Sequence, residues 1–357
     1  MAAEDPAPDP WRSVALEPPG AWGDTPVSGA LRVELADFDV EERLGFAPDG
    51  GEAHRLLLVE KIGANTLFVA RSLAVRAGKP AADIGFAGLK DRRAVARQWF
   101  SVPVTRDVAS FVGYSGDGFR VLAEHPHSRK LRRGALAGNR FHIRVRGLQG
   151  DPRAIEARAA HLVAAGIPNY YGLQRFGRDG TNLGRVRQWL ASGRLPRGRE
   201  PRGFVLSSAR SLAFNAVLAA RVGAGTWNRL LPGEVVNLAG SQSVFAAEHP
   251  DEGLQRRLEE GDVSPTGPLC GAGGVLPGGE AARVEAAALA TVAPVPALLA
   301  AVGMRGERRA LMLRPGAFRH RLDGDVLDLE FELPRGAFAT SVLRELVDVR
   351  VPESTDD

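Results

Sequence analysis

Residues 84–102, IGFAGLKDRRAVARQWFSV, contain two apolar stretches separated by the charged turn Lys90-Asp91-Arg92-Arg93. Residues 84–89 and 95–102 are rich in strand-forming side chains, so we predict two short strands joined at this turn. Asp91 then leaves a strand with basic residues on both sides of it. Neighbouring cations favour the ionised form of a carboxylate, which suits a nucleophile better than a general acid. The same pattern also fits a solvated turn with a surface ion pair worth about 1 kcal/mol or less.

Strand and helix patterns continue on both sides of this segment. Residues 55–61 (RLLLVEK) predict a strand, and residues 66–77 predict a helix with Asn65 as its N-cap. Further along, apolar and basic residues alternate over residues 141–146, which indicates a strand with one apolar and one basic face. Residues 1–27 are rich in Pro, Gly and Asp without periodicity, so we expect a poorly ordered lead-in.

The order of these patterns predicts two domains. Strand-rich sequence gives way after residue 168 to longer helical segments with Gly/Pro/Arg-rich connections, and strand patterns return after residue 312. This order favours an α/β protein of the α+β type in which one domain is inserted into another. We therefore expect a discontinuous domain, 28–167 and 313–357, and an inserted helix-rich domain, 168–312.

Composition excludes several classes of protein. The chain has 357 residues, a net charge of +4 and a single cysteine, Cys270, which excludes a disulfide framework, a structural zinc cluster and an iron–sulfur site. The sequence contains neither a P-loop, a complete dinucleotide-binding fingerprint nor an HExxH motif, so we expect neither a cofactor nor a metal. The Gly-rich surroundings of Cys270 supply no acid or base for a cysteine nucleophile.

Neither the N-terminal residues nor the longest uncharged stretch predicts a membrane protein. Residues 1–10 are acidic and Pro-rich, unlike a signal peptide. The longest uncharged stretch, 286–304, is mostly alanine and contains Pro294 and Pro296, so packed helices broken near the prolines explain it better than a membrane span. We expect a cytoplasmic protein.

Basic residues are concentrated in two runs. Because 46 residues are basic and only four of them are lysine, the abundance of arginine resembles the bias of a GC-rich genome and is weak evidence for nucleic-acid binding. Residues 129–146, however, hold seven basic residues and no acid, and residues 175–202 hold eight arginines against two acids. The first run ends in basic and aromatic residues that interleave as they do on RNA-binding surfaces. Phe141 fits a strand core equally well, and the second run fits a solvated surface.

Five motifs in order resemble one enzyme family. Residues 85–102 resemble the catalytic motif of the TruD family of tRNA pseudouridine synthases, centred on its Gly-x-Lys-Asp. Four further stretches look like family signatures and follow the family order: FDVEERLGF (38–46), RKLRRGALAGNRF (129–141), PNYYGLQRFG (168–177) and FATSVLREL (338–346). Together the motifs span roughly residues 27–347.

The resemblance implies isomerisation of uridine to pseudouridine in tRNA, at the uridine 13 position typical of the family, without cofactor or metal. It maps the nucleophilic aspartate onto Asp91. The basic partner of that aspartate, a lysine in close relatives, falls on Arg32, and Lys90 would support the same carboxylate. The implied architecture is a catalytic domain with a curved, mainly antiparallel sheet and an inserted TruD domain. Neither a membrane nor an obligate protein partner is implied, and tRNA is the expected partner.

The resemblance also assigns substrate contacts. The stacking aromatic of the family maps onto Phe141, and further substrate contacts map onto Phe38, Asn139 and Phe338. Together with the two basic runs, it leads us to expect RNA-backbone contacts from six residues: Arg129, Lys130, Arg132, Arg133, Arg175 and Arg178.

Two other functions fit the sequence. One is a different tRNA-modifying enzyme such as a methyltransferase, and the other is a non-catalytic RNA-binding or RNA-folding protein. The sequence also leaves open whether Asp91 acts at the ribose, toward a glycal, or adds to C6 of uracil.

Overall fold

The computed structural model describes residues 9–104 and 109–352, apart from the side chain of Arg178, and divides the chain into two compact units. Unit 1 contains Met1–Thr25, Ala157–Arg314 and Ala337–Leu346, and unit 2 contains Pro26–Glu156, Pro315–Gly336 and Val347–Asp357. These bounds differ from the expected domains mainly at two segments, 157–167 and 337–346, which belong to unit 1. The assignment of one domain as catalytic and the other as inserted stays a prediction.

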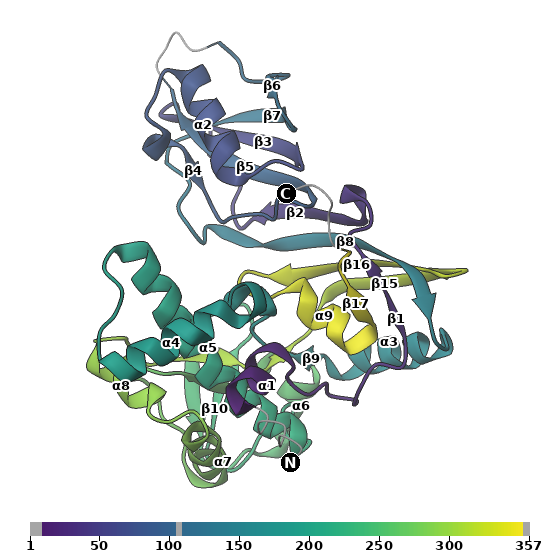
Figure 1. Cartoon of the computed structure of the whole chain (residues 1–357), viewed down its shortest axis with the longest axis vertical. Coiled ribbons are helices and arrows are strands. Elements are labelled where there is room, and N and C mark those ends of the chain that lie inside the picture. Colours follow the sequence, from purple (N-terminus) through teal and green to yellow (C-terminus); the bar gives the residue numbers. More distant parts are fainter. Residues whose placement is uncertain (1–8, 105–108, 353–357) are drawn as a thin grey trace, which may run out of the picture. The chain divides into compact units, whose positions relative to one another are not determined.

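Unit 2 is built on a mostly antiparallel sheet, with eleven strands among the described residues (Figure 1). Only β1–β17 and β2–β5 pair in parallel within this described sheet. The expectation of an α/β fold with a mainly antiparallel sheet is therefore confirmed. Eight strands follow one path in the order β15 (Gly316–Asp323), β16 (Val326–Pro334), β8 (Leu136–Gln149), β2 (Phe38–Leu44), β5 (Val95–Pro103), β3 (His54–Ile62), β7 (Phe119–His127) and β6 (Ser115–Gly116). Three more pair beside it: β1 (Ser28–Leu31), β17 (Asp348–Arg350) and β4 (Gly85–Phe86).

Helix α2 (Thr66–Ala77) covers one face of this sheet (Figure 1). As predicted, the Asn65 side chain accepts a hydrogen bond from the Leu67 amide, and Gly78 ends the helix in the left-handed conformation at φ 61°. The buried face of the helix, including Val69 and Leu73, packs on apolar residues of β3, β5 and β7. The loop from β4 to β5, which carries Asp91, is supported by this layered core.

Unit 1 combines helices with a second sheet. The four-stranded antiparallel sheet follows the order β11 (Val244–Ala247), β10 (Glu234–Leu238), β12 (Val263–Leu269) and β13 (Glu307–Ala310), and β9 (Ile167–Pro168) pairs with β14 (Met312–Leu313). We did not predict this sheet from the sequence, because β12 contains Pro265 and Pro268, which are unfavourable in most strands. The helices are α1 (Pro10–Leu16), α3 (Arg153–Ala165, mostly in this unit), α4 (Thr181–Ser192), α5 (Arg199–Gly223), α6 (Glu252–Glu259), α7 (Gly279–Ala290), α8 (Val295–Ala301) and α9 (Ala339–Leu346).

Two segments of unit 1 are apolar enough to be compared with membrane spans. Helix α5 reaches a mean hydropathy of 1.3, but 61% of the relevant window is buried, as in the core helix of a soluble protein. The alanine-rich stretch forms α7 and α8, which meet at a 95° bend after Ala290. The expected break near the prolines is therefore present.

The expectation of a poorly ordered lead-in is wrong for residues 10–25, whereas residues 1–8 lie outside the described residues. Helix α1 begins with Pro10 at its first position, and the Asp9 side chain caps it by accepting from the Trp11 amide. Trp11 and Ala15 are buried in the same core as Trp189 of α4. Two apolar anchors one helical turn apart outweigh the Pro/Gly-rich composition around them.

We expect Trp11→Ala to lower the free energy of unfolding by about 3 kcal/mol, because it removes a buried indole from this core. Thermal and urea unfolding followed by circular dichroism would measure the loss. The control Arg12→Ala changes the adjacent exposed residue and should leave stability within about 0.5 kcal/mol. Equal stability of the two variants would contradict the packing described for α1.

Glu345 of α9 makes the stability of unit 1 depend on pH. Its side chain is fully buried and accepts a hydrogen bond from the Ala21 amide at 3.0 Å. Burial raises the pKa of Glu345 to about 7. The folded chain then holds this proton to a higher pH than the unfolded chain, so stability falls as the pH rises from about 4.5 to about 7.

We expect Glu345→Gln to be more stable than the wild type at pH 8, by at most about 3 kcal/mol, because no charge is then buried. The difference should shrink as the pH falls and disappear below about pH 4.5, where the carboxyl is protonated in both states. Urea unfolding at both pH values would measure it, with exposed Glu17→Gln as the control. A constant difference across pH would show that the effect does not come from titration.

Candidate active site

The turn that carries Asp91 is fixed by hydrogen bonds to side chains of neighbouring elements. Lys61, at the end of β3, donates from Nζ to the carbonyl of Asp91 at 2.6 Å and to that of Ala64 at 2.9 Å. The amide of Lys90 donates to Oγ1 of Thr66 at 3.1 Å, and Gln98 donates to the carbonyl of Gly88 at 2.7 Å. Backbone groups before and at Asp91 are therefore held by side chains of α2, β3 and β5.

Lys61 is the functional candidate that sequence reasoning missed. Its side chain is completely buried, and burial lowers its pKa to about 8, while the negative charge of Asp91 acts in the opposite direction. A lysine is rarely buried without a reason, since desolvation of an ammonium is costly. A single lysine at the end of the apolar stretch RLLLVEK was the signal available in the sequence.

Arg32 forms an ion pair with the carboxylate of Asp91. The Asp91 side chain remains 57% exposed, so its carboxylate is accessible to a ligand. The side chain of Arg32 is mostly buried, at 21% exposed. The guanidinium of Arg32 also lies over the ring of Phe38, 4.2 Å from its centroid. The predicted pair of Asp91 and Arg32 is thus brought together by the fold, directly after β1.

The backbone at Arg32 is strained. Its φ of 62° lies in the left-handed region, which is unfavourable for a residue with a Cβ atom. The Arg32 carbonyl accepts from Arg93 at 3.2 Å, so the turn around Asp91 helps to hold this conformation. Strain of this kind persists only where surrounding contacts determine it, and such positions cluster at functional sites.

Lys90 does not contact the carboxylate of Asp91. Its ammonium pairs with Glu42 of β2, whose side chain is fully buried and also accepts from the Trp99 amide at 3.0 Å. The side chain of Lys90 itself is only 9% exposed. Lys90 therefore supports the turn through Glu42, and the structure gives it no direct contact with the Asp91 side chain.

Aromatic rings cross neighbouring strands beside Arg32. Phe38 of β2 meets Phe141 of β8 edge to face with ring centroids 6.0 Å apart, and Phe141 stacks on Phe331 of β16 at 5.4 Å. All three rings are buried. The sequence allowed two interpretations of Phe141, and the structure shows one of them, packing in the core of the strand. Stacking on a base stays a prediction.

Asn139 lies two residues before Phe141, opposite Glu42 on one neighbouring strand and Leu333 on the other. Its Oδ1 atom is buried and has no hydrogen-bond donor among the described residues. Buried acceptors are nearly always satisfied, so this oxygen is a candidate for contact with a ligand.

The first basic run divides into two parts. Arg140, Arg144 and Arg146 on β8 pair with carboxylates of neighbouring elements. The expected RNA contacts in the loop before β8 are exposed, and in the described part of the chain no carboxylate pairs with them: Arg129, Lys130, Arg132 and Arg133. Of these, the Lys130 ammonium donates to the Ala82 carbonyl at 2.5 Å, and Arg133 lies over the Phe86 ring at 4.2 Å.

The remaining predicted contacts belong to unit 1. Phe338 is half-buried beside Tyr171, with ring centroids 6.0 Å apart, and the guanidinium of Arg175 lies 5.9 Å from the Phe338 centroid. The structure thus brings Phe338 and Arg175 together. Their relation to Asp91, in the other unit, stays a prediction, and the side chain of Arg178 lies outside the described residues.

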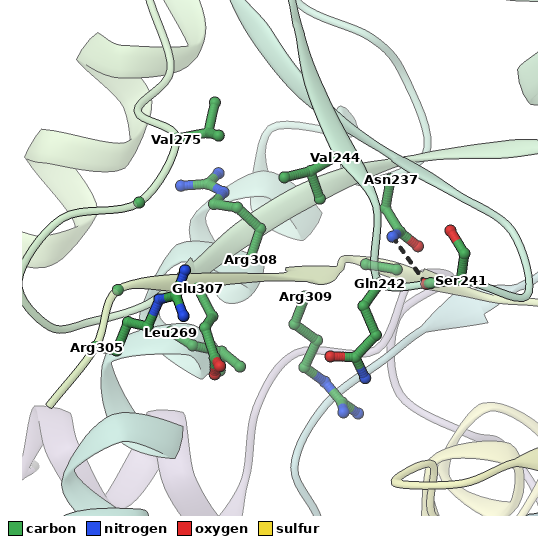
Figure 2. Close-up of a pocket in the computed structure, with 13 residues that line it drawn as sticks. Asn237, Ser241, Gln242, Val244, Leu269, Val275, Arg305, Glu307, Arg308 and Arg309 are labelled. Atoms are coloured by element: carbon green, nitrogen blue, oxygen red, sulfur yellow. Dashed lines mark hydrogen bonds between the residues drawn. The ribbon is translucent and has the colours of Figure 1, made fainter.

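Unit 1 also contains a pocket of about 530 Å³ along β13. Polar side chains of the β10–β11 turn and arginines of β13 line it, among them Asn237, Gln242, Arg308 and Arg309 (Figure 2). Cys270 follows Leu269, which lines this pocket, but Cys270 itself is buried. Burial raises the pKa of its thiol to about 11. A thiol in that state is a poor nucleophile.

Comparison with known proteins identifies the family. The sequence profile of tRNA pseudouridine synthase D (TruD) matches residues 21–197 and 201–346. The chain belongs to the TruD family. Relatives named tRNA pseudouridine synthase D include one from Methylococcus capsulatus, 43% identical over 92% of this chain and 94% of its own. Another, from Azotobacter vinelandii, is 45% identical over 93% of this chain and 94% of its own.

The fold agrees with this membership. A crystal structure of a Methanosarcina mazei protein assigned to TruD superimposes with a TM-score of 0.72, covering 94% of this chain and 97% of that one. At 22% identity this likeness supports the fold alone. The predicted TruD membership is confirmed by the profile and by the relatives.

We expect Lys61→Met to loosen the turn around Asp91, because two carbonyls lose their buried donor, at about 1–3 kcal/mol each. Hydrogen exchange of peptides covering residues 88–94 should accelerate by about tenfold or more. The control Lys79→Met replaces a half-buried lysine elsewhere and should leave this exchange unchanged. Unaltered exchange in Lys61→Met would show that the turn does not depend on Lys61.

Proposed function

We propose that this protein isomerises uridine to pseudouridine in tRNA, at uridine 13, with Asp91 as the nucleophile or base. The observation that carries the proposal is the exposed Asp91 carboxylate, paired with Arg32 on a turn fixed by Lys61. Membership of the TruD family supports the reaction class. A cytoplasmic location is part of the same proposal.

The reaction requires the target base to leave its stack. Uracil inside a helix hides the atoms that react, so the nucleotide is flipped out. Asp91 acts at the ribose, toward a glycal, or adds to C6 of uracil. In either route the bond between N1 and C1′ breaks, the base turns, C5 bonds to C1′, and the proton of C5 is lost while N1 gains one.

The neighbours of Asp91 would position the base. Arg32 orients the carboxylate through their ion pair, and its guanidinium in turn lies over the Phe38 ring. The unpartnered Oδ1 of Asn139 would accept from the N3–H of uracil, which satisfies a buried acceptor. Phe38, Phe141 and Phe338 would contact the base or its ribose, as the family resemblance implies.

The RNA backbone would contact the basic residues that lack carboxylate partners. In unit 2 these are the exposed residues of the loop before β8, whereas the arginines on β8 are neutralised within the sheet. Binding should therefore weaken steeply as salt rises, because each phosphate contact releases counterions.

We expect Asp91→Asn to abolish pseudouridine formation while tRNA affinity stays within a few-fold, because the amide keeps the shape and loses the nucleophilic oxygen. Carbodiimide mapping of tRNA from cells carrying either form would show both activity and position. The control Asp83→Asn changes an exposed aspartate on the preceding turn and should remain active.

Substantial turnover by Asp91→Asn would remove Asp91 from the catalytic role. Restoration of cellular function by this variant without pseudouridine would instead favour an RNA-folding protein. Pseudouridine at a position other than 13 would keep the chemistry and correct the site.

A further inference from the structure

Two arginines of unit 1 share one tyrosine ring without a neutralising carboxylate. The guanidinium of Arg309 lies 4.3 Å from the centroid of the Tyr171 ring, and that of Arg175 lies 5.3 Å from the same centroid. Arg309 donates to the carbonyl and side-chain oxygens of Asn169 and also interacts with the Tyr171 side chain. Arg175 donates to the Ser207 hydroxyl. Two like charges thus contact one ring, and the hydrogen-bond acceptors named here are neutral.

Three other arginines of unit 1 have carboxylate partners. Arg308 pairs with Glu285 at 2.9 Å, and Arg210 pairs with Glu307 at 3.1 Å. Figure 2 shows Arg308 and Arg309 leaving β13 on opposite sides, so Glu285 does not serve both. Deeper in the unit, buried Arg221 pairs with Glu234. Arg308, Arg210 and Arg221 thus each have a carboxylate partner, whereas among the described residues Arg175 and Arg309 have none.

Each of the two arginines carries a buried donor atom without a partner among the described residues. The Nε atoms of Arg175 and Arg309 and Oγ1 of Thr340 are buried and have no partner among the described residues. Burial lowers the pKa of Arg309, the Tyr171 side chain acts in the opposite direction, and the charge of Arg175 lowers it further. An anion with several acceptor oxygens would satisfy these donors and remove the repulsion.

We propose that Arg175 and Arg309 together bind one phosphate of the tRNA backbone, next to the nucleotide that contacts Phe338. This rests on the proposed function, since it takes tRNA as the ligand. Arg175 also lies over the Phe338 ring, so a phosphate bound here would adjoin a base at that ring. A planar guanidinium can donate two hydrogen bonds to one phosphate, and two guanidiniums fit its tetrahedral oxygens.

The test is the salt dependence of tRNA binding by the full chain, measured by fluorescence anisotropy. We would vary KCl from about 50 to about 200 mM, because affinities that depend on phosphate contacts fall steeply over this range. Arg309→Gln and Arg175→Gln should each weaken binding by about tenfold and reduce the slope of log affinity against log salt by about one contact. Because one phosphate is shared, the double variant should lose little further slope.

Two further variants separate charge from geometry and packing. Arg309→Lys keeps the charge but not the paired donors, so it should keep the slope and lose affinity. The control Arg257→Gln removes an equal charge that Asp262 already neutralises, and its slope should equal that of the wild type. If Arg309→Gln proves unstable in thermal melting, half-exposed Arg175→Gln carries the same test.

Unchanged slopes in both glutamine variants, with normal tRNA binding and modification by the wild type, would overturn this site alone. A double variant that loses two contacts would overturn the shared phosphate. If inorganic phosphate raises the melting temperature through these arginines while the tRNA slope stays unchanged, the site binds free phosphate and the tRNA proposal is wrong. Failure of the wild type to bind or modify tRNA would instead refute the proposed function.

Discussion

The arrangement around Asp91 depends on the burial of one ammonium group. Lys61 reaches from the end of β3 to the carbonyl of Asp91, and the carbonyl of Ala64 accepts a second hydrogen bond from the same nitrogen. A buried lysine is costly, so the fold keeps it only with its acceptors in place. The carbonyl of Asp91 is therefore fixed, while its carboxylate stays exposed and pairs with Arg32.

This constraint explains why the site draws on distant parts of the sequence. Glu42 of β2 accepts from both Lys90 and the amide of Trp99, which ties the turn to the paired strands β2 and β5. Arg32 reaches the turn from the end of β1 in a strained backbone conformation, and Arg93 returns a hydrogen bond to it. Each contact joins elements far apart along the chain, so the geometry exists only in the folded sheet.

The local elements of the fold could be predicted from the sequence, and the tertiary contacts could not. The cap at Asn65, the stop at Gly78 and the strand containing Phe141 follow from local preferences of the chain. Helix α1 was missed because composition was weighed above its two apolar anchors, and Lys61 was missed because burial is not visible in one sequence. The family resemblance named Asp91 and gave it Arg32 as a basic partner, and the structure brings these two together as an ion pair. Only the structure shows that Lys90 pairs elsewhere.

In this protein, the carboxylate partners of individual arginines say more about RNA binding than the net charge does. A net charge of +4 is small for 357 residues, yet it results from many arginines that carboxylates cancel locally. Arg144 on β8 is cancelled by Asp328 across the strand pair, so it strengthens the sheet and contributes little field beyond it. An arginine without such a partner keeps its full attraction for a polyanion. The local pairing of each cation, which composition hides, therefore decides which arginines are available to RNA.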